Sequence, residues 1–210
     1  MRTRIKICGL TRPADVDEAV RAGADAIGLV FYPPSPRFVT LERAAELAAR
    51  VPPFVSVVGL FVNAERTFVE TACAAARLQT LQFHGDEAPA DCRGFGRPYI
   101  KAARVKPGVD LVEFAARFAD ACGILLDAHS EAYGGSGQCF DWSLIPSELP
   151  LPLILSGGLN AENVAGAVAR YRPWAVDVSS GVEAAKGIKD GAKIAAFIAG
   201  VKDGEARSSV

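Results

Sequence analysis

Short runs of apolar residues alternate along the whole chain with longer segments in which apolar and polar residues are mixed. Such short runs, bounded by Gly, Pro or Asn, are typical of strands, and the near-continuous apolar run Val55–Val62 indicates a strand buried on both faces. The pattern predicts eight strands: Arg4–Cys8, Ala26–Phe31, Val55–Val62, Leu81–His84, Tyr99–Ala103, Ile124–Ala128, Leu153–Ser156 and Ala175–Ser179.

The longer segments between these strands have the length and periodicity of helices. They predict helices over Pro13–Ala22, Leu41–Arg50, Ala64–Arg77, Glu87–Cys92, Leu111–Ala119, Ala161–Arg170 and Asp190–Gly200. Between the sixth and seventh strands, the segment Asp141–Pro152 contains three prolines, which leave little room for a regular helix. We therefore expect the sixth helical segment to be short or irregular.

Eight strands that alternate with helical segments form either a closed barrel or an open doubly wound sheet. The barrel is favoured because 210 residues match the compact end of its size range. Polar and glycine-rich residues also follow nearly every strand, where a barrel assembles its active site. We expect an α/β fold with one (β/α)8 TIM barrel over residues 1–202, followed by a polar tail over residues 203–210 that frays.

The chain is nearly neutral, with 23 Lys and Arg against 24 Asp and Glu. This balance gives no basic patch, so we expect neither nucleic acid nor a membrane surface as a partner. The N-terminus is unlike a signal peptide, and no apolar run reaches the roughly 18 residues of a membrane helix. Five cysteines without a C-x-x-C pair argue against a zinc site or a disulfide framework, and favour a reducing cytoplasm.

Two glycine-containing loops follow the seventh and eighth strands. Gly157 and Gly158 precede a predicted helix, where backbone N–H groups attract an anion, and Ser180 and Gly181 follow the neighbouring strand. Loops at these two places are the usual phosphate site of the barrel. Either loop alone is equally well an ordinary turn with a helix cap, but the two together favour the binding of a phosphate group.

Two side chains near strand ends are candidates for proton transfer. Asp127, beside the glycine-rich loop Tyr133–Gln138, is suited to a general acid, although an aspartate there is also typical of a helix cap or turn. Cys8 ends the first strand and is suited to a base or nucleophile. Cysteine is often only a small buried apolar residue, and we prefer that interpretation for Cys73, Cys92, Cys122 and Cys139.

Other residues near strand ends are candidates for contacts with a substrate. Arg37 lies in a proline-stiffened loop where it can pair with a carboxylate, although a solvated surface arginine is the commoner case. His84 can either donate a hydrogen bond to a substrate or position a loop. Lys6 and Lys101 lie within strands, and neither requires a Schiff-base mechanism. Two histidines, without a G-x-G-x-x-G fingerprint, favour neither a metal site nor a dinucleotide cofactor.

The motifs and their order resemble those of the phosphoribosylanthranilate isomerase family of tryptophan biosynthesis. They span most of the chain and are highly specific when taken together. They are Lys6–Thr11, Ser35–Arg37, Phe61–Asn63, Leu81–Glu87, Leu126–Ala128, Gly134–Gln138, Phe140–Trp142, Ser156–Asn160, Val176–Glu183 and Gly187–Asp190. Phe83 and Ser156 stand where Leu and Ala are common in the family, and neither change alters a candidate catalytic group.

The resemblance implies an Amadori rearrangement of N-(5-phosphoribosyl)anthranilate to 1-(2-carboxyphenylamino)-1-deoxyribulose 5-phosphate, without a metal or organic cofactor. It implies that Asp127 is the general acid that opens the ribose ring, and that Cys8 is the general base that removes a proton from C2. It also implies that Arg37 holds the anthranilate carboxylate. The residues implied near the phosphate are Gly157, Gly158, Ser180 and Gly181, with the loop that contains Gly134 and Gly135 closing nearby.

Two other interpretations are consistent with a barrel. An aldose–ketose isomerase of the histidine-biosynthesis type would use two aspartates in similar half-barrels, whereas the first strand here carries Cys8 and the halves lack obvious similarity. A non-catalytic phosphosugar-binding barrel should have lost at least one of Cys8, Asp127 and Arg37. The sequence leaves the oligomeric state open between monomer and homodimer, and it does not decide whether Asp177 contacts a ligand.

Overall fold

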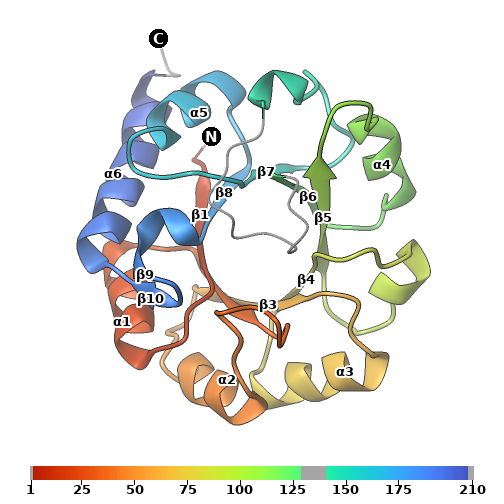
Figure 1. The fold of residues 1–210 in the computed structure, drawn as a ribbon, viewed down its shortest axis with the longest axis vertical. Coiled ribbons are helices and arrows are strands. Elements are labelled where there is room, and N and C mark those ends of the chain that lie inside the picture. Colours follow the sequence, from red (N-terminus) through yellow and green to blue (C-terminus); the bar gives the residue numbers. More distant parts are fainter. Residues whose placement is uncertain (1, 129–140, 208–210) are drawn as a thin grey trace.

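Eight parallel strands form a closed barrel in which each strand pairs with the next along the chain and the last pairs with the first. The computed structural model describes residues 2–128 and 141–207. Figure 1 shows the strands as an inner ring with the helices around it. The strands are β1 (Arg4–Cys8), β2 (Ala26–Val30), β3 (Ser56–Phe61), β4 (Thr80–Phe83), β5 (Tyr99–Val105), β6 (Gly123–Ala128), β7 (Leu153–Leu155) and β8 (Ala175–Val178).

A helical segment follows each strand, and local sequence sets several of the helix ends. Pro13 lies in the first turn of the first helix, which ends at Gly23 with a φ of 101°. Thr40 caps the second helix by accepting a hydrogen bond from the backbone of Arg43. The segments are α1 (Pro13–Ala22), α2 (Leu41–Ala48), α3 (Arg66–Ala75), η1 (Pro89–Cys92), α4 (Leu111–Arg117), η2 (Trp142–Leu144), α5 (Val164–Tyr171) and α6 (Gly191–Arg207).

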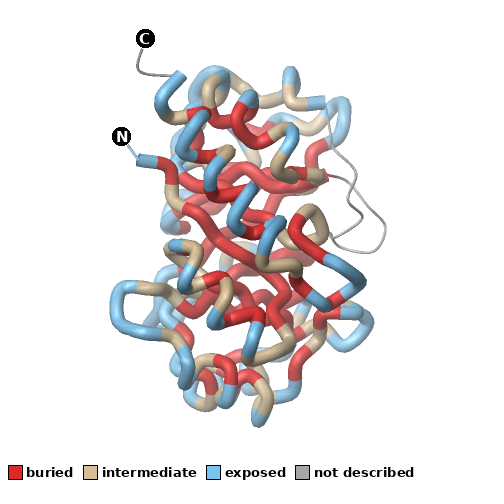
Figure 2. The backbone as a smooth tube through the Cα atoms, turned by 90° about the vertical axis from the view of Figure 1, so that its left-hand side faces the viewer, coloured by how far each residue is buried: buried red, intermediate tan, exposed pale blue. Residues whose placement is uncertain are grey.

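The strand residues are almost all buried, and Figure 2 shows buried residues through the middle of the molecule. Along β1, Ile7 belongs to a large apolar cluster that also contains Val16 and Ala19 of α1, so it packs outward against the helices. The next residue, Cys8, belongs to a separate cluster with Val30 inside the barrel. Strand alternation therefore directs every second side chain of β1 into the interior.

The barrel confirms the predicted fold class, and the sixth helical segment is irregular as the prolines predict. In the described part of the connection after β6, the helical structure is the three-residue η2. The fourth segment, predicted as a short helix, is the 3-10 helix η1. The sequence did not predict the 3-10 helix η3 (Ser180–Val182), or the hairpin of β9 (Glu183–Ala185) and β10 (Ile188–Lys189) that follows it. These elements are too short to carry a periodic pattern.

The C-terminal end of the chain differs from the prediction. The sequence predicts a helix that ends at Gly200 and a fraying tail from residue 203, whereas α6 continues to Arg207. For residues 203–207 the prediction of a fraying tail was wrong, because this polar segment packs against the barrel. A Cβ at Gly204 would lie 2.6 Å from a backbone oxygen of α5, so the two helices lie in close contact there. Glu205 accepts a hydrogen bond from the backbone of Thr3, which joins the two ends of the chain.

Candidate active site

The side chains with candidate chemistry lie at the face of the barrel where the strands end, the face on which barrel enzymes carry their active sites. Cys8 is the last residue of β1, Asp127 is the penultimate residue of β6, and His84 directly follows β4. Arg37 lies in the connection between β2 and α2. All four residues are buried. The fold thus brings residues from four separate parts of the sequence to one end of the barrel.

The carboxylate of Asp127 is held by two hydrogen bonds. Its Oδ2 lies 3.0 Å from Nε2 of His84, and its Oδ1 accepts from the backbone N–H of Ala128 at 2.9 Å. The amide nitrogen of Gln82 lies 2.9 Å from Nδ1 of His84. The two ring nitrogens of His84 therefore link the amide of Gln82 to the carboxyl group of Asp127. Gly157 passes so close that a Cβ there would lie 3.0 Å from Oδ1 of Asp127.

The thiol of Cys8 is buried inside the barrel and stands over Gly28 of β2. A Cβ at Gly28 would lie 2.7 Å from Sγ of Cys8, so glycine leaves the space that the thiol fills. Burial raises the pKa of Cys8 because a thiolate loses its hydration there. The ammonium groups of Lys6 and Lys189 act in the opposite direction and lower it. A basic thiolate at this position therefore depends on nearby cations.

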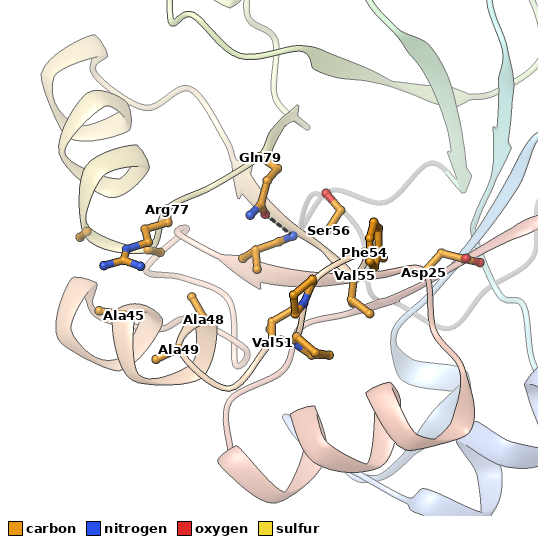
Figure 3. Close-up of a pocket in the computed structure, with 15 residues that line it drawn as sticks. Asp25, Ala45, Ala48, Ala49, Val51, Phe54, Val55, Ser56, Arg77 and Gln79 are labelled. Atoms are coloured by element: carbon orange, nitrogen blue, oxygen red, sulfur yellow. Dashed lines mark hydrogen bonds between the residues drawn. The ribbon is translucent and has the colours of Figure 1, made fainter.

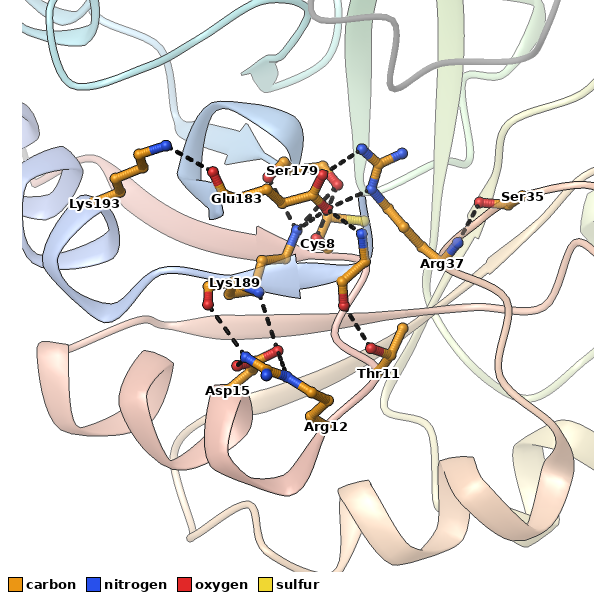
Figure 4. A network of polar contacts seen from close by, with 11 residues as sticks. Cys8, Thr11, Arg12, Asp15, Ser35, Arg37, Ser179, Glu183, Lys189 and Lys193 are labelled. Atoms are coloured by element: carbon orange, nitrogen blue, oxygen red, sulfur yellow. Dashed lines mark hydrogen bonds and ion pairs between the residues drawn. The ribbon is translucent and has the colours of Figure 1, made fainter. Parts of the chain in front are cut away.

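Arg37 is held by Glu183 in a buried bidentate ion pair (Figure 4). Nε and Nη2 of Arg37 donate to Oε1 and Oε2 of Glu183 at 2.7 and 2.8 Å. Nζ of Lys189 lies 3.0 Å from Oε1 of the same carboxylate, and it also donates to the backbone oxygen of Ser179 at 3.0 Å. Burial alone would raise the pKa of Glu183, but the hydrogen bond from Arg37 and the charge of Lys189 lower it. Nη1 of Arg37 takes no part in this ion pair.

The two loops predicted to bind phosphate lie against each other. Gly157 and Gly158 have φ angles of 75° and 71°, a backbone conformation that favours glycine. Gly181 packs so closely onto the carbonyl of Leu159 that no side chain fits there. Ser180 precedes Gly181 as the first residue of η3. The backbones of the loops after β7 and β8 are therefore in direct contact.

Part of the predicted site lies outside the described residues, namely the loop with Gly134 and Gly135. Within residues 2–128 and 141–207, no group of three or more His, Cys, Asp or Glu side chains is placed to hold a metal ion. In the same two ranges, none of the helices has both the length and the apolar character needed to cross a membrane.

The chain is similar to known proteins over nearly its whole length. The model of a family described as N-(5'phosphoribosyl)anthranilate (PRA) isomerase matches residues 5–200. The chain belongs to this family. The N-(5'-phosphoribosyl)anthranilate isomerase of Dechloromonas aromatica is 66% identical over 202 residues, which cover 96% of this chain and 97% of the relative.

Solved structures of phosphoribosylanthranilate isomerases have the same fold. The crystal structure of the Thermotoga maritima protein matches with a TM-score of 0.88 and 45% identity, covering 95% of this chain and 98% of that chain. A second crystal structure, of a phosphoribosyl anthranilate isomerase in complex with reduced 1-(o-carboxyphenylamino)-1-deoxyribulose 5-phosphate, matches with a TM-score of 0.85 and 42% identity over the same shares of the two chains. The barrel predicted from the sequence is therefore the fold of the family.

Several charged residues surround the candidate groups of this phosphoribosylanthranilate isomerase family member, and the sequence predicted no role at the site for them. Lys6 lies two positions before Cys8, and a period of two along β1 would have placed both side chains on its inner face. Nζ of Lys6 pairs with Oδ1 of Asp177 at 2.9 Å, across the register between β1 and β8. Glu183 and Lys189 belong to the β9–β10 hairpin, for which the sequence gives no clear signal.

A pocket of about 760 Å³ lies at the other end of the barrel, beside the starts of β2, β3 and β4. Figure 3 shows Ala45 and Ala48 of α2 along its wall, together with Val51, which follows the helix. Phe54 lies at the same pocket, is fully exposed and has a φ of 71°, which a non-glycine residue rarely adopts. This pocket is on the face opposite the candidate catalytic groups, so it is a separate feature of the molecule.

Proposed function

We propose that the chain catalyses the isomerisation of N-(5'-phosphoribosyl)anthranilate in tryptophan biosynthesis, with Asp127 as the general acid and Cys8 as the general base. Family membership gives the reaction. The observation that supports these roles is a hydrogen-bonded carboxyl group on β6 and a buried thiol on β1, two strands that lie on different sides of the barrel (Figure 1). An acid and a base on separate strands can contact two different atoms of a bound sugar.

The first two proton transfers of the Amadori rearrangement each have a group to perform them. Protonated Asp127 gives its proton to the ribose ring oxygen while the C1–O bond breaks, and the lone pair of the substrate nitrogen forms the C=N bond of an iminium. The thiolate of Cys8 removes the proton from C2. The C–H electrons form a C1=C2 double bond, and the electrons of the C=N double bond move onto the nitrogen, which gives an enolamine. Proton transfer to C1 and loss of the enol proton then give the ketone product. The substrate nitrogen accepts the electrons, so these steps require no metal or organic cofactor.

The binding of the substrate is assigned to groups around these two residues. Arg37 uses Nε and Nη2 to hold Glu183, so Nη1 and the second hydrogen of Nη2 can bind the anthranilate carboxylate. His84 orients Asp127 beside the sugar. The two loops after β7 and β8, which lie in contact, have backbone N–H groups that can bind the phosphate. The residues assigned to the phosphate are Gly157, Gly158, Ser180 and Gly181, and a contribution from Gly134 and Gly135 stays a prediction.

Turnover by the wild-type protein tests the proposed reaction. The substrate is generated in the assay, and the loss of its anthranilate-type fluorescence is followed with and without a metal chelator. We expect turnover at the same rate in both cases. A correctly folded protein that leaves the fluorescence unchanged would contradict the proposal. The substrate of the histidine-biosynthesis aldose–ketose isomerase, assayed in parallel, tests whether the chain has that second activity instead.

We also propose that two copies of the chain form a homodimer through the pocket at the N-terminal face of the barrel. Phe54 is a fully exposed aromatic side chain beside a largely apolar pocket of the same chain. Each copy therefore offers both an inserting side chain and a pocket, and a two-fold axis can match both at once. A Thermotoga maritima relative, 39% identical with a TM-score of 0.84, is described as a dimeric phosphoribosylanthranilate isomerase from which monomers were made. A cytoplasmic location stays a prediction.

A further inference from the structure

We propose that Lys6 is a positioning residue that stabilises the thiolate of Cys8, and that Asp177 limits how strongly it does so. The inference rests on the proposed role of Cys8 as the general base. Lys6 and Asp177 take no part in the proton transfers described above. Their place inside the barrel next to the thiol gives them this separate role.

The ammonium of Lys6 and the thiol of Cys8 lie next to the same position of the barrel interior, above Gly28. Both side chains extend from the inner face of β1 and converge over Gly28 of β2. A Cβ at Gly28 would lie 2.7 Å from Sγ of Cys8 and 3.0 Å from Nζ of Lys6. Lys6 is only 5% exposed, so its charge acts on the thiol through a medium of low dielectric constant rather than through water.

Asp177 is the second partner of the same ammonium. Its Oδ1 lies 2.9 Å from Nζ of Lys6, and both residues are buried. Burial alone would lower the pKa of Lys6, but the charges of Asp177 and of ionised Cys8 raise it above its ordinary value. Lys6 therefore stays charged while the thiol titrates. One buried ammonium thus lies between the carboxyl group of Asp177 on one side and the thiol of Cys8 on the other.

The charged groups around Cys8 act on it with opposite signs. Burial raises the pKa of the thiol, Lys6 on β1 lowers it, Asp177 on β8 raises it, and Lys189 on β10 lowers it by less than Lys6 does. Removal of Lys6 and removal of Asp177 must therefore shift the ionisation of Cys8 in opposite directions. If the ion pair were only structural, the loss of either partner would have the same kind of effect.

The experiment titrates Cys8 directly and does not depend on turnover. The rate at which iodoacetamide alkylates Cys8 is measured by mass spectrometry of its peptide, over a pH range on both sides of the ordinary cysteine pKa of about 8.5. At neutral pH we expect alkylation to be roughly tenfold slower in Lys6→Met and faster than wild type in Asp177→Asn. The double variant Lys6→Met/Asp177→Asn leaves no unpaired buried charge, and it should fall between wild type and Lys6→Met.

A buried lysine elsewhere in the barrel provides the matched control. Lys101 of β5 is buried and pairs with Glu87 at 2.9 Å, and it is not one of the principal groups that act on Cys8. Lys101→Met should leave the alkylation profile of Cys8 unchanged. The inference is overturned if the folded Lys6→Met or double variant keeps the wild-type profile. It is also overturned if the two single substitutions shift the profile in the same direction.

The proposed function and this inference can fail separately. If Cys8→Ser abolishes turnover while the alkylation profile does not respond to Lys6→Met, Cys8 is still the base and the role of Lys6 is wrong. If the profile responds as expected while Cys8→Ser turns over at the wild-type rate, the assignment of Cys8 as the base is wrong. In that case the stabilisation of its thiolate by Lys6 stands.

Discussion

Arg37 has a long side chain with many rotamers, and Glu183 fixes one of them by accepting two hydrogen bonds from its guanidinium. A guanidinium that is already in place loses less conformational entropy when it binds a carboxylate of a substrate. The proposed contact with anthranilate thus depends on a residue that does not itself touch the substrate. Lys189 adds a second cation on the same carboxylate.

Glu183→Gln is expected to raise KM by about tenfold or more with a smaller change in kcat. The amide of the new glutamine can accept through one oxygen only, and its NH2 group faces the guanidinium of Arg37. A charge-assisted hydrogen bond of roughly 1.5–3 kcal/mol is therefore lost. Steady-state kinetics measure the effect. Glu113→Gln, on α4, is the control and should behave as wild type. An unchanged KM in Glu183→Gln would show that Arg37 does not need this partner.

The pH dependence of the Arg37–Glu183 pair follows from its lowered carboxyl pKa. Because the pKa of Glu183 is lower in the folded protein than its ordinary value, the ion pair contributes to stability above the ordinary glutamate pKa of about 4.3. That contribution is lost as the pH falls through the lower folded value. Urea unfolding in acid should therefore show a smaller loss of stability for Glu183→Gln than for wild type. Equal losses would contradict the pairing.

Among the elements, α6 joins the end of the chain to the rest of the barrel. Val201 is almost completely buried, Gly204 allows close packing on α5, and Glu205 binds the backbone near the first strand. A helix with such contacts belongs to the fold rather than to a polar tail. Its last turns therefore contribute to the stability of the whole barrel.

Removal of residues 201–210 should lower the melting temperature by several degrees. The burial of a side chain such as Val201 is worth about 1.5–3 kcal/mol, and about 1 kcal/mol shifts Tm by roughly 2–4 °C in a chain of this size. Circular dichroism melts measure the change. Removal of residues 208–210 alone serves as the control, with an expected Tm close to wild type. A longer truncation that melts like the full chain would contradict the role given to α6.

The sequence predicts the eight strands to within two residues at each end, because strands buried on both faces appear as apolar runs. It also predicts that Cys8 and Asp127 lie at one face, because both are close to the C-terminal ends of strands. It does not predict the contact between His84 and Asp127, or the pair of Lys6 and Asp177. Those contacts join residues far apart in the sequence and depend on how the closed barrel curves.

At the level of the whole molecule, the two ends of the barrel differ in chemical character. Buried polar and charged groups lie around Cys8 and Asp127 at the C-terminal face. The N-terminal face carries the largely apolar pocket and the exposed Phe54. Proton transfer and subunit contact are therefore assigned to opposite ends of one fold.

Phe54→Ser is expected to convert a homodimer into a monomer while turnover stays close to wild type, since the substitution lies on the face opposite the catalytic groups. Analytical ultracentrifugation measures the oligomeric state, and the fluorescence assay measures turnover. Val112→Ser removes another exposed apolar side chain, on α4, and should leave the dimer intact. A wild-type protein that sediments as a monomer would contradict the proposed interface.

The most direct test of the catalytic assignment is the turnover number of Asp127→Asn and Cys8→Ser at saturating substrate. Asp17→Asn, in which an exposed carboxylate paired with Arg50 is lost, is the control. General acid–base catalysis contributes about 10²–10⁴-fold, so each catalytic variant should lose activity on that scale while the control keeps it. If folded Asp127→Asn or Cys8→Ser retains wild-type turnover, the residue concerned does not transfer the proton assigned to it.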